Sequence, residues 1–232
     1  MSIIRIDRRF RGPPDSGNGG YVAGRLAAAL GGSGGVVTLR SPPPLDTDLR
    51  IDIAGDDAAL LHESVPVAVA TRMAVHVDVP PPPGLAEAEA AEAGFTGFDR
   101  HIFPGCFVCG PDRACGDGLR LFAGRIRDGG ERVAAAWTPA ADLGDGAGRV
   151  AIPFLWAALD CPGYFAVEAL AGRAVLGRIG AVVRDAPETG EPLIVTGWAI
   201  AHDGRKHRAG TAIHRADGRL AAAAVATWIS IS

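Results

Sequence analysis

Two features of this chain could do chemistry without a cofactor: a carboxylate inside an apolar run, and paired glycines at a helix start. Asp160 stands in a largely apolar stretch at residues 152–170, where burying a carboxylate is costly unless it is paired or used. Such a carboxylate can orient a water molecule and take its proton. The structural alternative is that Asp160 caps a helix that restarts at Pro162, whose missing N–H is harmless in the first turn.

Gly19 and Gly20 lie where a glycine-rich loop passes into an alanine-rich helical stretch. Backbone amides at a helix N-terminus carry partial positive charge and can hold an oxygen that gains negative charge. Without a Cβ, both glycines would let a ligand approach the backbone closely. Asn18 and Asp15 can cap the helix or point into a pocket. The alternative is a capped helix start behind a flexible loop.

Four potential metal ligands lie in one loop: His101, Cys106, Cys109 and Cys115. Cys-x-x-Cys is half of many zinc sites, so a structural zinc at Cys106, Cys109 and Cys115 is chemically possible. A second Cys-x-x-Cys is missing, and the chain is long enough to fold without metal. We therefore predict no metal and a reduced, partly buried cysteine pair, ahead of zinc and then of a disulfide. Cys161 could be a nucleophile only beside a histidine, and a small buried apolar role is the prediction.

Composition excludes several classes of protein. The chain has 232 residues, 48% of them hydrophobic, which suffices for a sizeable core. Its net charge of −3 provides no basic surface for nucleic acid. No apolar run reaches the roughly 18 to 20 residues that span a bilayer, and the start does not resemble a signal peptide. A cytoplasmic location is the expectation. Lys206 is the sole lysine among many arginines, and with abundant Ala and Gly this suggests a bacterial, GC-rich genome.

Periodicity and breakers predict two similar series of elements. The first is a strand at 3–10, a helix at 21–30, and strands at 36–40, 49–54, 59–69 and 71–79. The second is a loop at 101–118, strands at 119–126 and 132–137, a buried helical region at 152–170, and strands at 174–184, 193–202, 205–214 and 219–231. Four prolines at 80–83 and an Ala/Glu-rich segment that could form a short helix lie between them. We predict units at 1–84 and 101–232 joined by a linker at 85–100.

The two series also share sequence. Arg40 and Arg184, Pro43 and Pro187, and Leu49 and Leu193 lie at one offset of 144 residues (184 − 40). Upstream, Gly19-Gly20-Tyr21 is echoed by Pro162-Gly163-Tyr164 at about the same offset. A fixed offset of this kind is typical of an internal duplication. Each unit then has a helix that can bury itself only in the curve of an antiparallel sheet, which predicts the α+β class.

These features resemble a known family. The order of strand, buried helix and meander, with Gly-Gly-Tyr at the helix start and Arg-x-x-Pro before a strand, is similar to the hotdog fold of acyl-CoA thioesterases in its fused, double-hotdog form. Cys106-Phe107-Val108-Cys109-Gly110, followed by Gly118-Leu119, is similar to the start of many single-hotdog proteins of this type. Dehydratases, hydratases and non-catalytic proteins share the fold, so the resemblance is more specific for fold than for substrate.

The resemblance implies hydrolysis of an acyl thioester, with acyl-CoA as the partner and no cofactor. The Gly19 and Gly20 amides would hold the carbonyl oxygen, Asp160 would act on the water, and Asn18 would belong to the same catalytic site. Similar double-hotdog thioesterases add a hydroxyl and an amide side chain from later strands, whereas the last strand here offers only Thr227. A catalytically silent protein that binds acyl-CoA or another hydrophobic ligand is therefore the alternative.

The remaining predictions concern ligand contacts and assembly. A hairpin turn at Asp203-Gly204 explains the shape of the basic loop at 202–208. Arg205 and Lys206 in this loop are nonetheless candidates for the phosphates of coenzyme A. Tyr21 and Tyr164 are the candidates for further contacts to it. The double unit could also form a homo-oligomer.

Overall fold

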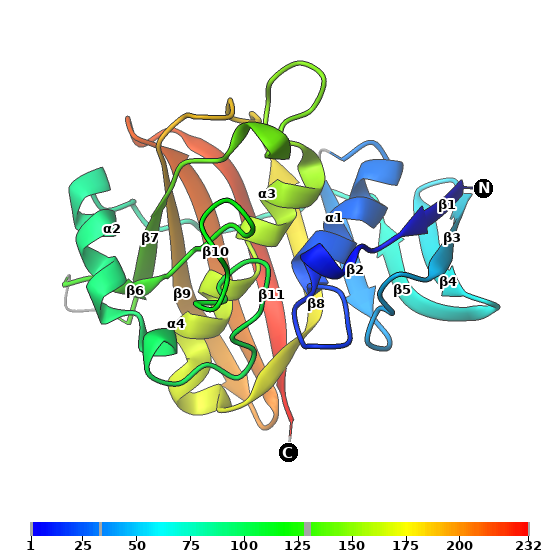
Figure 1. The fold of residues 1–232 in the computed structure, drawn as a ribbon, viewed down its shortest axis with the longest axis horizontal. Helices are drawn as coiled ribbons and strands as arrows, with labels where there is room; N and C mark the ends of the chain where they lie inside the picture. Colours follow the sequence, from blue (N-terminus) through cyan, green and yellow to red (C-terminus); the bar gives the residue numbers. More distant parts are fainter. Residues whose placement is uncertain (1, 33, 128–130, 232) are drawn as a thin grey trace.

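The strands of this protein form one eleven-stranded antiparallel sheet in a computed structural model, which describes residues 2–32, 34–127 and 131–231 (Figure 1). Their order across the sheet is β1-β3-β4-β5-β2-β8-β11-β10-β9-β7-β6. The strands are β1 (Ser2–Arg5), β2 (Gly34–Leu39), β3 (Asp48–Ala54), β4 (Asp57–His62), β5 (Val65–Thr71), β6 (Gly124–Arg125), β7 (Val133–Trp137), β8 (Ala174–Val183), β9 (Leu193–Asp203), β10 (Lys206–Arg215) and β11 (Leu220–Ser230).

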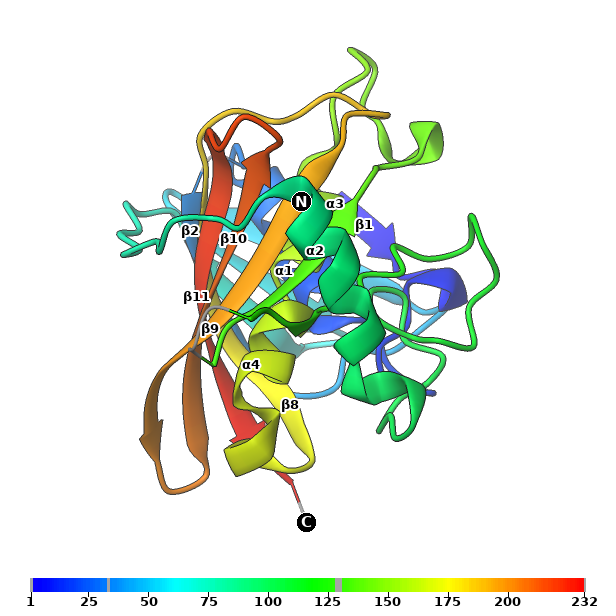
Figure 2. The same cartoon turned by 90° about the vertical axis from the view of Figure 1, so that its left-hand side faces the viewer.

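Four α-helices accompany the sheet in the described ranges: α1 (Gly19–Ala29), α2 (Leu85–Ala91), α3 (Ile152–Ala158) and α4 (Cys161–Ala171). Short 3₁₀ turns lie at Arg8–Phe10, Glu92–Gly94, Thr96–Phe98 and Ala141–Leu143. Figure 2 shows α4 lying along one face of the sheet. None of the helices in this part of the chain combines the length and apolar character needed to cross a membrane.

The two halves of the sheet repeat one topology. The order β1-β3-β4-β5-β2 in the first half matches β7-β9-β10-β11-β8 in the second, and β6 adds a short outer strand. The halves meet where β2 and β8 pair antiparallel, with Val36 opposite Gly180. This relation confirms the predicted α+β fold of two like units, each an antiparallel sheet against a central helix.

Local hydrogen bonds locate the repeat more finely than the sequence does. Before the helices, the bond from Phe10 N to Asp7 O has its counterpart in the bond from Leu143 N to Ala140 O, at an offset of 133 residues (143 − 10). In the bonds from Gly17 N to Pro43 O and from Val150 N to Pro187 O, the donors are again 133 apart but the acceptors are 144 apart. The second half therefore carries 11 additional residues between its first helical turn and its next strand.

Because of these additional residues, the sequence match between Gly19-Gly20-Tyr21 and Pro162-Gly163-Tyr164 is wrong. Gly20 lies against Ala157, and Gly24 lies against Pro153. Because Pro153 and Ala157 are 133 residues after Gly20 and Gly24, the two contacts are equivalent under the repeat. The counterpart of Gly19-Gly20-Tyr21 is thus residues 152–154, not Pro162-Gly163-Tyr164. The second-half helix is longer, and it is broken into α3 and α4.

Small residues in α1 allow its close crossing with α3. A Cβ on Gly24 would lie 2.6 Å from Pro153 Cα, and one on Gly20 would lie 2.7 Å from the carbonyl oxygen of Trp156. Side chains at these positions would force the two helices apart. The helix starts at the Asn18 cap and ends at Gly31 and Gly32, which both have positive φ.

Four predicted strands are wrong in detail. The strand predicted at 3–10 is β1, which ends at Arg5, and Arg8–Phe10 form a 3₁₀ turn. Residues 59–69 are not one strand but parts of β4 and β5, with a turn in which Glu63 has a φ of 55°. Residues 72–79 form no strand, since β5 ends at Thr71. Of residues 119–126, only Gly124 and Arg125 join the sheet. The segment before them pairs instead with the cysteine loop, through bonds from Leu119 N to Phe107 O and from Leu121 N to Val108 O.

The segment between the halves packs on the second one. Helix α2 buries Ala88 and Ala91 against a satellite core of Ile126, Ala134 and Ile194. Upstream of α2, every second residue is a valine that packs on the sheet. These valines, Val75, Val77 and Val79, form a cluster with Trp198, Ala212 and Ala223 of the sheet. The segment therefore covers the sheet face opposite α4. The unit boundaries at 84 and 101 remain a prediction.

Candidate functional site

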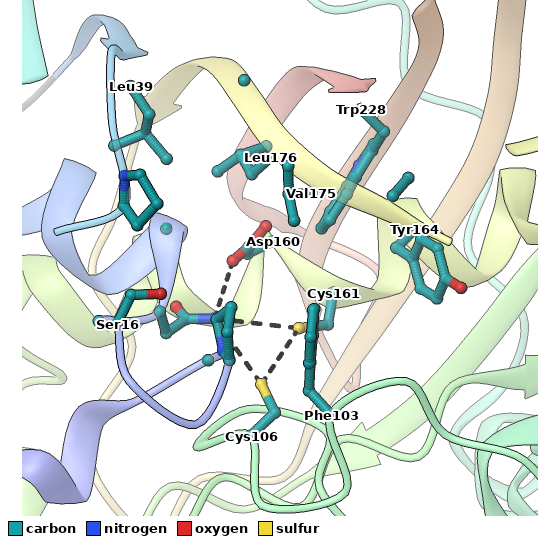
Figure 3. A pocket seen from close by; sticks show the side chains of 18 of the residues that line it. Ser16, Leu39, Phe103, Cys106, Asp160, Cys161, Tyr164, Val175, Leu176 and Trp228 are labelled. Carbon is teal, nitrogen blue, oxygen red and sulfur yellow. Dashed lines mark hydrogen bonds between the residues drawn. The ribbon is translucent and has the colours of Figure 1, made fainter. Parts of the chain in front are cut away.

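A cavity of about 310 Å³ lies where the two halves meet, between the start of α1 and the α3–α4 junction. The cysteine loop and strands β8 and β11 close its other sides. Figure 3 shows Leu39, Leu176 and Trp228 around Asp160, with the sulfur atoms of Cys106 and Cys161 facing each other. Its lining is mostly apolar; the residues include Pro43, Ile102, Phe103, Tyr164, Val175 and Ile229.

The break between α3 and α4 places Asp160 in this cavity. Helix α3 ends at Ala158. The carbonyl oxygen of Leu159, in the break between the helices, accepts a 2.7 Å hydrogen bond from Thr211 Oγ1. Asp160 occupies the N-cap position of α4, but its side chain makes no capping bond. The structural alternative from the sequence, an N-cap role, is therefore wrong. The carboxylate points across to α1 instead.

One oxygen of Asp160 is held by the first half, and the other is free. Oδ2 accepts hydrogen bonds of 2.9 Å from both Asn18 Nδ2 and Gly20 N. Oδ1 is buried and has no partner among the described residues. Burial raises the pKa of Asp160 to about 7, against the opposing effect of the hydrogen bonds from Gly20 and Asn18. A buried carboxylate with an unpartnered oxygen is suited to bind a water molecule or a substrate hydrogen.

Asn18 joins the helix start to the carboxylate. Its Oδ1 accepts a 2.9 Å bond from Tyr21 N, which caps α1, while its Nδ2 donates to Asp160. Because the oxygen and the nitrogen of the Asn18 side-chain amide are both hydrogen-bonded, the amide is held in one orientation. Asn18 therefore fulfils both expectations at once, since it caps α1 and also lines the cavity.

The two glycines have different roles. Gly19 lines the cavity, and its amide has no acceptor among the described residues. A Cβ there would lie 2.9 Å from the side chains of both Leu176 and Leu39. The Gly20 amide is already bonded to Asp160, so it positions the carboxylate. The expectation that both amides face a ligand is corrected to Gly19 alone.

The cysteines gather differently from the sequence prediction. Cys106, Cys109 and Cys161 are buried, and their sulfur atoms all lie within 4.8 Å of one another. Cys115 is exposed and lies outside this group. All four thiols are free, in accord with the predicted reduced state. Hydrogen bonds from the Cys109 and Cys161 thiols lower the pKa of Cys106, whereas the pKa values of Cys109 and Cys161 are raised.

Several predicted contacts lie elsewhere. Tyr21 does not line the cavity but stacks on Phe10 with ring centroids 4.2 Å apart. Arg205 lies at a hairpin tip, where it donates to the carbonyl of Ser230, and neither it nor Lys206 lines a cavity described here. Thr227 also lies outside the lining. Tyr164 does line the cavity, and its hydroxyl donates to Gly172 O at 2.9 Å.

A second cavity of about 600 Å³ adjoins the first. His101, Ile102 and Tyr164 line both. The second cavity also has three exposed arginines without acidic partners among the described residues: Arg100, Arg125 and Arg173. No sequence pattern groups these cations, because they come from three segments that only the fold brings together.

Comparison with solved structures identifies the fold. A candidate thioesterase II from Thermobifida fusca superimposes with a TM-score of 0.65 at 15% identity, over 99% of this chain and 93% of the other. A candidate thioesterase from Novosphingobium aromaticivorans gives 0.61 at 11% identity, over 99% and 95%. The tesB protein of Mycobacterium avium subspecies paratuberculosis gives 0.61 at 12%, over 93% and 88%. This chain is a double-hotdog protein. No protein-family model and no curated protein matches its sequence.

The double-hotdog arrangement has one polar site where its symmetry would provide two. At the 133 offset, Asn18 corresponds to Ala151, and Asp160 corresponds to Ala27. Ala151 caps α3 without a side-chain bond, and Ala27 is buried in the core. The counterpart of the Asn18–Asp160 pair is therefore apolar, and of these two positions only the start of α1 holds the polar pair.

Proposed function

We propose that this double-hotdog protein hydrolyses acyl thioesters of coenzyme A. The observation that carries the proposal is the buried Asp160 carboxylate, which has one oxygen held by Asn18 and Gly20 and the other free beside an apolar cavity. The three solved structures that share the fold are named as thioesterases or as a tesB protein, which supports the same reaction class.

The chemistry needs two groups, and each has a candidate. Asp160 Oδ1 accepts a hydrogen bond from the attacking water and takes its proton as the new C–O bond forms. The Gly19 amide, at the positive end of α1, donates to the carbonyl oxygen as that oxygen gains charge. The C–S bond then breaks, and the proton passes to the departing thiolate. Gly20 and Asn18 position Asp160.

The two cavities match the two ends of such a substrate. The apolar walls made by Leu39, Leu176 and Trp228 suit an acyl chain. The arginines of the second cavity suit the phosphates of the nucleotide, for which guanidinium groups are strong partners. His101 and Tyr164 line both cavities, so a pantetheine arm could pass between them.

A specific observation favours the catalytically silent alternative as second candidate. Strand β11 presents Trp228 and Ile229 to the cavity, and Thr227 does not line it. A hydroxyl or amide from this strand would help to hold the water. A protein that binds acyl-CoA without cleaving it would have the same cavities.

Thiol release from a panel of acyl-CoAs separates the two candidates. We expect wild type to release free thiol and Asp160→Asn to lose at least about 100-fold in kcat while it still binds acyl-CoA, as for loss of a general base. Asp78→Asn is the matched control, because the Asp78 side chain is 99% exposed and is expected to keep wild-type activity. Binding without thiol release by wild type would exclude hydrolysis.

Location and assembly follow only as expectations. Three buried, free cysteines are typical of a reducing compartment, which supports a cytoplasmic location. The net charge of −3 argues against nucleic acid as a partner. Homo-oligomers of the double unit stay a prediction for size measurements in solution.

A further inference from the structure

The three buried cysteines come from two distant parts of the chain. Cys106 and Cys109 lie in the loop after α2, and Cys161 is the first residue of α4. The Cys106 and Cys161 sulfur atoms are 3.8 Å apart. Two thiolates that bind one zinc ion at about 2.3 Å in tetrahedral geometry are also about 3.8 Å apart.

The cysteine loop has the backbone support that a metal site needs. Gly110 N donates to Cys106 O at 2.9 Å, which closes the turn. A Cβ on Gly110 would collide with the backbone oxygens of Pro104 and Cys106, so only glycine fits. The turn directs both sulfur atoms to one side.

The surroundings of the sulfur atoms favour thiolates, which in turn need a counter-charge. Cys161 opens α4, where the helix dipole stabilises negative charge. Asn18 Nδ2 lies 3.9 Å from the Cys106 sulfur and 4.0 Å from that of Cys161. Thiolates buried without a counter-charge are costly, and a divalent ion removes that cost. An odd number of mutually close thiols also cannot be satisfied by disulfides alone.

We propose that Cys106, Cys109 and Cys161 bind one zinc ion, which joins the cysteine loop to the start of α4. All three residues line the apolar cavity, so a fourth coordination position faces that cavity. This ligand set differs from the one that the sequence suggested, since Cys161 takes the place of Cys115. The proposal stands apart from thioester hydrolysis, because the metal can be measured without a substrate.

Metal analysis of the untagged protein, purified with a reductant and without chelator, tests the site. We expect about one zinc per chain in wild type, and at least an about tenfold loss in Cys106→Ser and in Cys161→Ser. Cys115→Ser is the matched control and should keep its zinc, because Cys115 is exposed and outside the cluster. Variants that keep full zinc content would overturn the ligand set.

Cobalt provides a second measurement that does not depend on the variants folding. Adding CoCl₂ to metal-free wild type should produce thiolate-to-cobalt charge-transfer absorption in the near ultraviolet, and zinc should abolish it. Wild type that holds less than about 0.1 zinc per chain and gives no such absorption would overturn the proposal. A Cys106–Cys161 disulfide in the protein as purified, found by peptide mass mapping, would do the same.

Discussion

Asn18 Nδ2 donates a 2.9 Å hydrogen bond to Asp160 Oδ2, and this bond joins the first helix of one half to the broken helix of the other. Both residues are almost fully buried. Because the other end of the Asn18 side chain caps α1, the position of the carboxylate depends on the helix start. Stability and activity should therefore respond differently to substitutions at position 18.

Replacing Asn18 separates its two roles. Asn18→Ala removes the cap and the donor, so we expect about 1 kcal/mol lower stability and at least an about tenfold fall in kcat. Asn18→Ser keeps a capping oxygen but is too short to donate to Asp160. We expect its stability near that of wild type and its kcat as low as that of Asn18→Ala. Urea unfolding and thiol release measure the two effects, and an Ala variant with full kcat would contradict the role of Asn18.

The α1–α3 crossing should tolerate no side chain at Gly24. A Cβ there would lie 2.6 Å from Pro153 Cα and 2.8 Å from Trp156 Cβ. We expect Gly24→Ala to lower the free energy of unfolding by at least about 1–3 kcal/mol, despite the better helix propensity of alanine. Gly146→Ala is the control, since no atom lies within 4 Å of its Cβ position. Equal urea midpoints for both variants would show that the helices can move apart.

The second-half strands and the buried Asp160 carboxylate were predictable because the sequence carries their signals directly. Strand alternation and the 144-residue match around Pro43 and Pro187 place strands β7 to β11 correctly. Asp160 stood out as a carboxylate within apolar neighbours. The helix match failed because the sequence of α4 resembles that of α1, whereas the packing counterpart of α1 is α3.

The ligand-contacting residues were less predictable because they depend on tertiary contacts. Cys161 meets Cys106 across 55 residues, and no spacing rule signals that contact. Arg205 lies at the tip of the β9–β10 hairpin and lines neither cavity; β9 has 11 residues, whereas its counterpart β3 has 7, and the sequence does not reveal this difference. Arg100, Arg125 and Arg173 could not be grouped without the fold.

Leu176 should set the acyl length that the cavity accepts. Its side chain lies beside Gly19 and Asp160 in the apolar wall. Leu176→Ala enlarges the cavity, so we expect the acyl length with the highest kcat/KM to increase by about two to four carbons. Leu176→Phe should shorten it. A profile of kcat/KM against chain length measures the shift, and identical profiles for the three proteins would place the acyl chain elsewhere.

The second cavity should bind the nucleotide of coenzyme A. Reversing one charge, in Arg125→Glu or Arg173→Glu, is expected to raise KM for an acyl-CoA by about tenfold through the loss of a charged hydrogen bond. The same variants should leave KM unchanged for the matching acyl-pantetheine, which has no nucleotide phosphates.

Arg205→Glu provides the control, because Arg205 lines neither cavity and donates to Ser230 O. We expect its KM for acyl-CoA to stay within about twofold of wild type, as for a charge outside the binding surface. If KM rises in Arg205→Glu but not in Arg125→Glu and Arg173→Glu, the nucleotide binds at the hairpin instead of in the second cavity. Salt sharpens the comparison, since wild-type KM for acyl-CoA should rise with ionic strength, while KM for acyl-pantetheine should not.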